Sequence, residues 1–124
     1  MFSTTITDKL VIHTCDSAVT VDGIVSAMRG WFDHSDFNPE IPVLWDFRFA
    51  EFDLASAAIE ELADRLLELT NEKRSGYKTA WLFGSSIPAQ VAVELLSKYD
   101  WQNRVRIFQN DYEAAVAWLT SIIK

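Results

Sequence analysis

Two short stretches of the chain constrain its fold more than any other feature, because apolar side chains occupy both of their faces. They are PVLWDFR, residues 42–48, and KTAWLFG, residues 78–84. A strand with one wet face alternates apolar and polar residues, whereas a strand covered on both faces is apolar almost throughout. Both stretches therefore predict central strands of a sheet that is flanked by helices.

Strand and helix patterns alternate along the rest of the chain. Three further strands are expected, at residues 2–7, 10–15 and 104–108, and a tight turn at Asp8 and Lys9 joins the first two into a hairpin. Four helices are expected from apolar residues spaced three and four apart, at residues 21–32, 54–70, 87–99 and 112–123. This order predicts one α/β domain over residues 1–124, with a mostly parallel sheet of four or five strands and an antiparallel edge strand.

Polar residues stand where the first and last of these helices should begin. Thr20 precedes an apolar stripe with helical spacing, made up of Val21, Ile24, Val25, Met28, Trp31 and Phe32. Asp111 precedes a second stripe with the same spacing. Since Thr and Asp side chains accept hydrogen bonds from the free N–H groups of a first helical turn, we expect both residues to be N-caps.

The charge of the chain limits what it can bind. Among 124 residues, 18 are acidic and 11 are basic, which gives a formal net charge of −7. A domain with this charge repels phosphate backbones and anionic lipid headgroups. We therefore expect no nucleic-acid partner, and we expect any peripheral contact with a membrane to be mainly apolar.

The sequence also indicates a cellular compartment. No stretch approaches the ~18–20 apolar residues that a membrane span needs, and the N-terminus lacks the basic start and apolar run of a signal peptide. The single cysteine, Cys15, cannot form an internal disulfide, which suits a reducing cytosol. We expect a cytoplasmic protein, with a peripheral location at the membrane as the alternative.

The chain resembles the SpoIIAA-like family of small bacterial proteins in four successive segments. These are PVLWDFR, a helix opened by Asp53, KTAWLFG, and the strand and helix of VRIFQNDYEAAVAWL. The family is related to STAS (anti-anti-sigma factor) domains and shares a fold type with CRAL-TRIO lipid-binding domains. The resemblance covers nearly the whole chain. It implies a βα superhelix, a role in protein–protein regulation or in holding a nonpolar molecule, and no enzymatic activity.

The resemblance does not extend to the phosphorylation site of STAS switches. Those switches carry a serine at the N-terminus of the helix after the central strand, in an Asp-Ser-Ser-Gly-like context. Here Asp53 fits, but Ala55 stands about where that serine would be, and no glycine follows. Ser56 lies one place later, roughly 100° round the helix. Asp53 and Ser56 are the regulatory candidates at this position, and we expect Ser56 to stay unmodified because the serine context of the switches is missing.

The sequence contains no dinucleotide-binding fingerprint, no Gly-Lys-Ser phosphate loop, no His-Glu-x-x-His, no paired Cys-x-x-Cys and no Gly-x-Ser-x-Gly motif. A nucleophilic triad of His13, Asp46 and Ser85 is disfavoured, because a half-buried strand histidine and a helix-capping serine explain these residues more simply. The spacing of His13, Cys15 and His34 matches no metal-ligand pattern. We predict a non-catalytic protein without a cofactor or metal, and a hydrolase is the least favoured alternative.

Ligand sites in open α/β sheets lie at the carboxyl ends of the strands. Polar or small residues stand at these ends: Cys15, Asp16, Asp46, Arg48, Gly84, Ser85, Ser86, Gln109 and Asn110. Asp46 is an acid within an otherwise apolar strand, and burial of an unpaired charge is costly. We therefore expect Asp46 to have a partner, which is Arg48, a loop amide or Ser85, and to serve the structure more than the function.

The expected helix at residues 87–99 is apolar over roughly 200° of its circumference, about twice the stripe that a surface helix needs. It packs either on the sheet and a neighbouring helix, or it faces a ligand, a second subunit or a bilayer. Strands that follow one another across a sheet place their crossover helices on one face. Another helix, a second subunit or a ligand must then cover the other face, and this helix is an available lid. The candidate ligand-binding residues are Trp45, Phe47, Trp81, Phe83, Ala89 and Val93.

A basic turn gives the densest positive patch of the sequence, with Lys73, Arg74 and Lys78. It is either a solvated turn or the place that first attracts an anionic partner or lipid headgroup. Two main hypotheses for function remain. The first is a non-catalytic module that holds a nonpolar small molecule or lipid, and the second is a STAS-type regulator that binds a protein such as a kinase-like anti-sigma factor. A homodimer is compatible with both.

Overall fold

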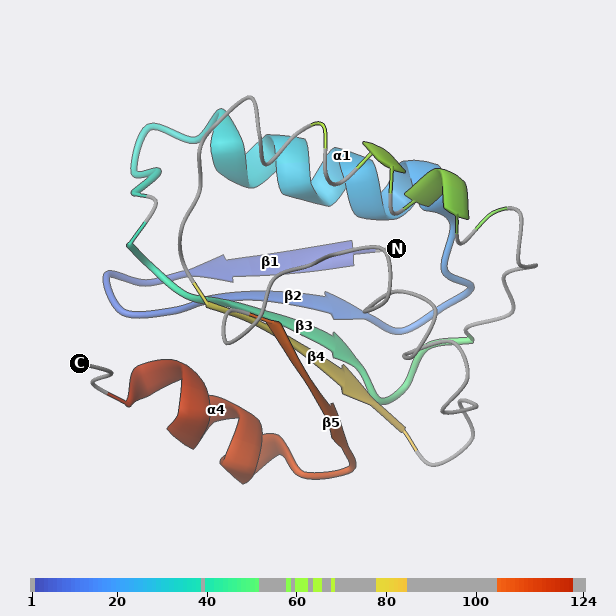
Figure 1. Cartoon of the computed structure of the whole chain (residues 1–124). Helices are drawn as coiled ribbons and strands as arrows, with labels where there is room; N and C mark the ends of the chain where they lie inside the picture. The colour runs from blue at the N-terminus through green and yellow to red at the C-terminus, as the bar shows by residue number, and fades with distance from the viewer. Residues whose placement is uncertain are drawn as a thin grey trace.

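The computed structural model describes residues 2–38, 40–51, 78–84 and 105–121, together with residues 58, 60–62, 64, 65 and 68. Within this part of the chain, five strands form one sheet whose spatial order follows the sequence (Figure 1). They are β1 (Phe2–Ile6), β2 (Val11–Cys15), β3 (Val43–Phe47), β4 (Thr79–Phe83) and β5 (Val105–Gln109). β1 runs antiparallel to β2, and the other neighbouring pairs are parallel. The expected mixed sheet with an antiparallel edge strand is confirmed.

Helices lie on both faces of the sheet (Figure 1). α1 (Val21–Phe32) covers one face, and α4 (Tyr112–Thr120), which follows the last strand, covers the other. Helical positions between residues 58 and 68 fall where a helix was expected, and Leu62 among them is buried in the same core as α1. The helix expected at residues 87–99 lies outside the described residues, so the count of four helices and the βα superhelix stay predictions. None of the described helices is long and apolar enough to cross a membrane.

The two described helices begin at the residues that the sequence indicated. Oγ1 of Thr20 accepts a hydrogen bond from the backbone N–H of Gly23 at 2.9 Å. Oδ1 of Asp111 accepts one from the backbone N–H of Ala114 at 3.0 Å. Each cap satisfies a donor that the first helical turn leaves free. The buried residues of α1 are those of the predicted stripe, except for the half-buried Val21: Ile24, Val25, Met28, Trp31 and Phe32.

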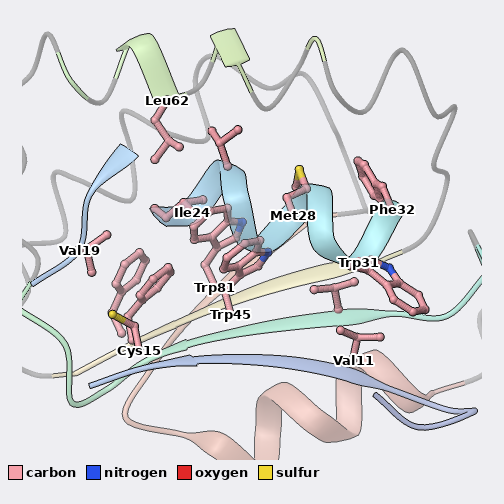
Figure 2. Close-up of a cluster of buried hydrophobic side chains, with 14 of the residues drawn as sticks. Val11, Cys15, Val19, Ile24, Met28, Trp31, Phe32, Trp45, Leu62 and Trp81 are labelled. Atoms are coloured by element: carbon pink, nitrogen blue, oxygen red, sulfur yellow. The ribbon is translucent and has the colours of Figure 1, made fainter. Parts of the chain in front are cut away.

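The face of the sheet under α1 carries a stack of aromatic rings. In the parallel register of β3 and β4, Trp45 pairs with Trp81 and Phe47 pairs with Phe83. The ring centroids are 5.3 Å apart in the first pair and 5.6 Å apart in the second, and the rings are nearly parallel. Figure 2 shows Trp45 and Trp81 between α1 and the sheet. Because aromatic side chains bury large areas, this stack supplies much of the core.

The opposite face of the same two strands packs against α4. Leu44 of β3 and Leu82 of β4 form a second core cluster with Ala80, Ala115 and Leu119. The sequence left open whether another helix, a second subunit or a ligand covers this face, and named the segment at residues 87–99 as an available lid. Over β3 and β4 the cover is α4, the last helix of the chain itself.

Candidate functional site

The four aromatic residues predicted to bind a nonpolar ligand lie in the core beneath α1. Trp45, Phe47, Trp81 and Phe83 are all buried, stack on one another and belong to the same cluster as the buried stripe of α1. The structure places them on one face of the sheet. In the described part of the chain they form packed interior, and their role in ligand binding stays a prediction.

Lys78 is the member of the predicted basic patch that the structure describes, and it binds the end of α4. Its Nζ donates to the carbonyl oxygens of Trp118 at 2.8 Å and of Ser121 at 3.0 Å. Burial, and then the charge of Arg106, lower the pKa of Lys78. A cation at this end satisfies carbonyl groups that the last turn leaves free. The remaining predicted site residues lie outside the described part: Asp53, Ser56, Lys73, Arg74, Ala89 and Val93.

His13 and Asp46 lie on opposite faces of the sheet, so they cannot form the acid–base pair of a triad. His13 pairs with Trp45 across β2 and β3, which places Asp46, the next residue, on the other face. The His13 side chain is 1% exposed, and its Nδ1 lies 2.8 Å from Oγ1 of Thr4. Burial lowers the pKa of His13 to about 4, so its imidazole is neutral near pH 7. Ser85, the third residue of that triad, lies outside the described residues.

Asp46 has the partner that its burial requires, and the partner is Arg48. Asp46 is only 4% exposed. The Arg48 guanidinium donates from Nε to Oδ1 at 3.0 Å and from Nη2 to Oδ2 at 2.9 Å, and its backbone N–H donates to Oδ1 at 3.1 Å. The hydrogen bonds to Asp46 raise the pKa of Arg48. Because two parallel bonds fix a guanidinium in orientation as well as in distance, the pair holds Arg48 in one place after β3.

The guanidinium of Arg48 contacts two aromatic rings, one from the loop after β3 and one from the first turn of α4. Its Cζ lies 5.2 Å from the centre of the Phe49 ring and 4.8 Å from the centre of the Tyr112 ring. Both distances are within the range of cation–π attraction. Phe49 is 69% exposed, and no other large hydrophobic side chain is exposed among the described residues. We call Arg48, Phe49 and Tyr112 the Phe49 cluster.

The ends of β4 and β5 support the Phe49 cluster. A Cβ atom on Gly84, which follows β4, would lie 2.7 Å from the carbonyl oxygen of Arg48, which follows β3. A residue without a side chain is therefore required where the ends of β3 and β4 meet. The backbone N–H of Asn110 donates to the carbonyl oxygen of Phe83 at 2.9 Å, and Asn110 has a left-handed φ of 56°. Asparagine tolerates this conformation better than most residues. The turn at Asn110 leads directly into α4 and brings Tyr112 next to Arg48.

The segments that carry the Phe49 cluster also carry acidic side chains. Four exposed carboxylates, which we call the acidic rim, belong to the chain segments that meet at this edge of the sheet: Asp16 directly after β2, Glu51 two residues after Phe49, and Asp111 and Glu113 on either side of Tyr112. The backbone N–H of Glu51 donates to the carbonyl oxygen of Ser17 at 3.0 Å, which ties the loop of Phe49 to the loop after β2. Arg48, the cation of the cluster, is paired with Asp46. Among the described residues, the segments that carry the cluster therefore hold more negative than positive charge.

Two adjoining hollows open near the other end of the sheet, beside the turn between β1 and β2. Their volumes are about 370 and 430 Å³, and both are lined by Asp8, Asn38 and Ile41. No group of three metal-binding side chains occurs among the described residues, here or elsewhere. The hollows mix acidic, amide and aliphatic groups, and they offer no arrangement that indicates a reaction or a particular ligand.

The two aromatic residues of the Phe49 cluster were not predicted from the sequence. The sequence indicated Asp46 and Arg48 at the carboxyl edge of the sheet, but the expected strand ended at Arg48, and Tyr112 was expected only as part of a helix. The available signal was an aromatic residue directly after a central strand, at the edge where open sheets place their ligand sites. The contact of Arg48 with Tyr112 had no signal in the sequence, because it depends on the turn between β5 and α4.

No protein-family model, curated protein or solved structure matches the chain. The resemblance to the SpoIIAA-like family therefore stays a prediction. The geometry of the chain itself has to support any conclusion about function.

Proposed function

We propose that this protein is a non-catalytic module that binds another protein through the Phe49 cluster. The observation that carries the proposal is the 69% exposure of Phe49 beside an arginine that a buried carboxylate holds in place. Removal of a Phe side chain from water contributes roughly 1.5–3 kcal/mol. Aromatic and arginine side chains are also the commonest anchors of protein interfaces. This role corresponds to the regulatory alternative that the resemblance to STAS domains implies.

The contacts that hold the Phe49 ring and its loop in place favour a binding role. On one side the ring contacts Arg48, which Asp46 fixes with two side-chain hydrogen bonds. The loop that carries the ring is tied to Ser17 through Glu51. A side chain that is already ordered before binding loses less conformational entropy in the complex, so more of the contact energy remains as affinity.

The polar groups near the cluster favour binding over catalysis. Both carboxylate oxygens of Asp46 accept hydrogen bonds from Arg48. His13 lies on the other face of the sheet, where it is buried and neutral. A general base must reach the proton that it removes from a substrate. Asp46 is engaged by Arg48 and His13 lies on the other face, so neither can act as a general base beside the Phe49 cluster.

Photo-crosslinking in cells of the source organism tests the proposal. Benzoylphenylalanine replaces Phe49 in one sample and Asp36 in a control sample; Asp36 is exposed and lines a hollow near the other end of the sheet. We expect one defined protein adduct from position 49 and none from position 36. Equal adducts from both positions, or no adduct from position 49, would contradict the proposal.

A second candidate function is the binding of a nonpolar small molecule or lipid beside the aromatic stack. The indole N–H groups of Trp31 and Trp45 are buried in the same core cluster and have no hydrogen-bond partner among the described residues. A buried donor without an acceptor costs about 1–3 kcal/mol. A ligand with a carbonyl or hydroxyl oxygen that reached either indole would remove this cost, which favours this candidate.

Native mass spectrometry of the freshly purified protein tests this second candidate. A bound molecule of apolar composition that is displaced on denaturation would support it. A spectrum that contains only the mass of the bare chain would contradict it. The same spectrum reports the subunit number and thereby tests whether the protein forms a homodimer.

A further inference from the structure

We infer that the partner of the Phe49 cluster presents an apolar recess bordered by lysine or arginine side chains. The inference rests on the proposed function and adds the chemistry of the partner. Two features that meet at this surface carry it. One is the exposed aromatic ring, and the other is the acidic rim on the segments that carry the cluster.

The exposed Phe49 ring is the reason why we expect an apolar recess on the partner. Although the ring contacts Arg48 on one side, 69% of the residue is open to solvent. A flat surface covers only part of such a ring, whereas a recess encloses it and excludes water, as around the anchors of known interfaces. Tyr112 is half-buried, and its ring is the second one that Arg48 contacts. It extends the apolar surface onto the first turn of α4.

The acidic rim is the reason why we expect positive charge on the partner surface. Its four members are all exposed: Asp16, Glu51, Asp111 and Glu113. Arg48 adds no net positive charge to this surface, because Asp46 is paired with it. At physiological salt, charges within about 8 Å still act on one another through solvent. A basic border on the partner is therefore attracted and an acidic border is repelled, and the net charge of −7 on the chain acts in the same direction at longer range.

The same charge distinguishes between classes of macromolecule. Nucleic acids and anionic lipid surfaces both present negative groups, which the acidic rim repels. A protein surface can combine an apolar recess with a positive border. The partner chemistry that fits the Phe49 cluster is therefore that of a basic protein surface.

Three synthetic amphipathic helical peptides serve as probes of this chemistry. The first has a leucine face bordered by lysines, the second has glutamate in place of every lysine, and the third has serine in place of every leucine. Each is titrated into the ¹⁵N-labelled full chain and followed by NMR. We expect the first peptide to bind about tenfold more tightly than either of the others, with shift changes centred on Phe49 and Tyr112. Equal affinity for the lysine and glutamate peptides overturns the inference.

Charge reversal at two places separates the acidic rim from the net charge. Asp16→Lys with Glu51→Lys should weaken binding of the lysine peptide about tenfold. Asp36→Lys with Glu40→Lys changes the net charge equally at exposed positions away from the cluster, and should change the affinity much less. Thermal unfolding confirms that each variant is folded. Equal weakening by both double variants means that only net charge matters, and it overturns the inference.

Phe49→Ser distinguishes a failure of the inference from a failure of the proposed function. If the lysine and glutamate peptides bind equally and Phe49→Ser weakens both, the Phe49 surface binds partners without a preference for charge. The inference is then wrong and the proposed function stands. If Phe49→Ser leaves the binding of every peptide unchanged, both are wrong.

Discussion

At the scale of single residues, the face of the sheet that a side chain occupies decides its chemistry. His13 and Asp46 are both polar and both buried, but they lie on opposite faces. The ring of His13 contacts a hydroxyl group and an indole ring, neither of which carries a negative charge. The neighbour of Asp46 is a guanidinium, whose positive charge compensates the carboxylate. The first environment favours a neutral group and the second favours an ion pair, and each leads to a measurable prediction.

The stability of the fold should depend on the protonation of His13. Burial lowers its pKa from 6.5 to about 4, so the unfolded chain takes up this proton at a higher pH than the folded chain does. The contribution of His13 to stability is therefore complete above about pH 6.5 and is lost as the pH falls toward 4. At 1.36 kcal/mol per pKa unit, the loss is on the order of 3 kcal/mol.

Urea denaturation of the parent and of His13→Gln at several pH values between 7 and 4 measures this contribution. Glutamine keeps a polar side chain near Thr4 but does not titrate. We expect the free energy of unfolding to fall more steeply with acidification in the parent. If both proteins lose stability in parallel, His13 is not the group responsible.

The Asp46–Arg48 pair should show strong coupling in stability. Arg48→Met leaves a carboxylate that is 4% exposed without its cation, which should cost about 3 kcal/mol. Asp46→Leu should cost less, because the Arg48 side chain is 29% exposed and reaches water. The double variant should be more stable than Arg48→Met alone. A double-mutant cycle from chemical denaturation checks this, and losses that simply add would show that the pair is not coupled.

At the scale of elements, the ends of the strands shape the candidate site more than their middles do. The middles of β3 and β4 form the aromatic stack, which is core. Their ends bring Arg48 against Gly84, and the turn after β5 brings α4 with Tyr112 against Arg48. A change at one strand end should therefore alter a surface that lies mostly on another element.

Two glycine substitutions test this account of the strand ends. Gly84→Ala places a methyl group 2.7 Å from the Arg48 carbonyl oxygen, so it should destabilise the fold by about 1–3 kcal/mol. It should also shift the NMR signals of Phe49 and Tyr112. Gly30→Ala is the control, since a Cβ atom there meets nothing within 4 Å. In that helix alanine should stabilise by up to about 1 kcal/mol. Thermal unfolding of both variants checks the prediction, and similar effects of the two substitutions would contradict it.

At the scale of the whole molecule, the sequence predicted the sheet and its packing better than the site. Local periodicity was sufficient for the strands, for the buried stripe of α1 and for the caps Thr20 and Asp111, because each depends only on nearby residues. The same reasoning identified Asp46 as an acid that needs a partner and named Arg48 among the alternatives. The structure confirms this pairing.

The Phe49 cluster could not be predicted because it depends on distances between elements. Tyr112 contacts Arg48 only because Asn110 adopts a left-handed conformation and starts α4 directly after β5. The separation of His13 from Asp46 likewise depends on the register between β2 and β3. Periodicity gives the face of a residue within its own element, but it does not give the register or the neighbours of that element.

The affinity of the crosslinked partner for Phe49→Ser tests the central claim most directly. Isothermal titration calorimetry of the purified partner compares this variant with the parent, after thermal unfolding has shown that the variant is folded. Loss of a buried aromatic anchor typically costs 2 kcal/mol or more, so we expect the affinity to fall about 30-fold. An affinity for Phe49→Ser within about twofold of the parent would show that the protein binds its partner through another surface.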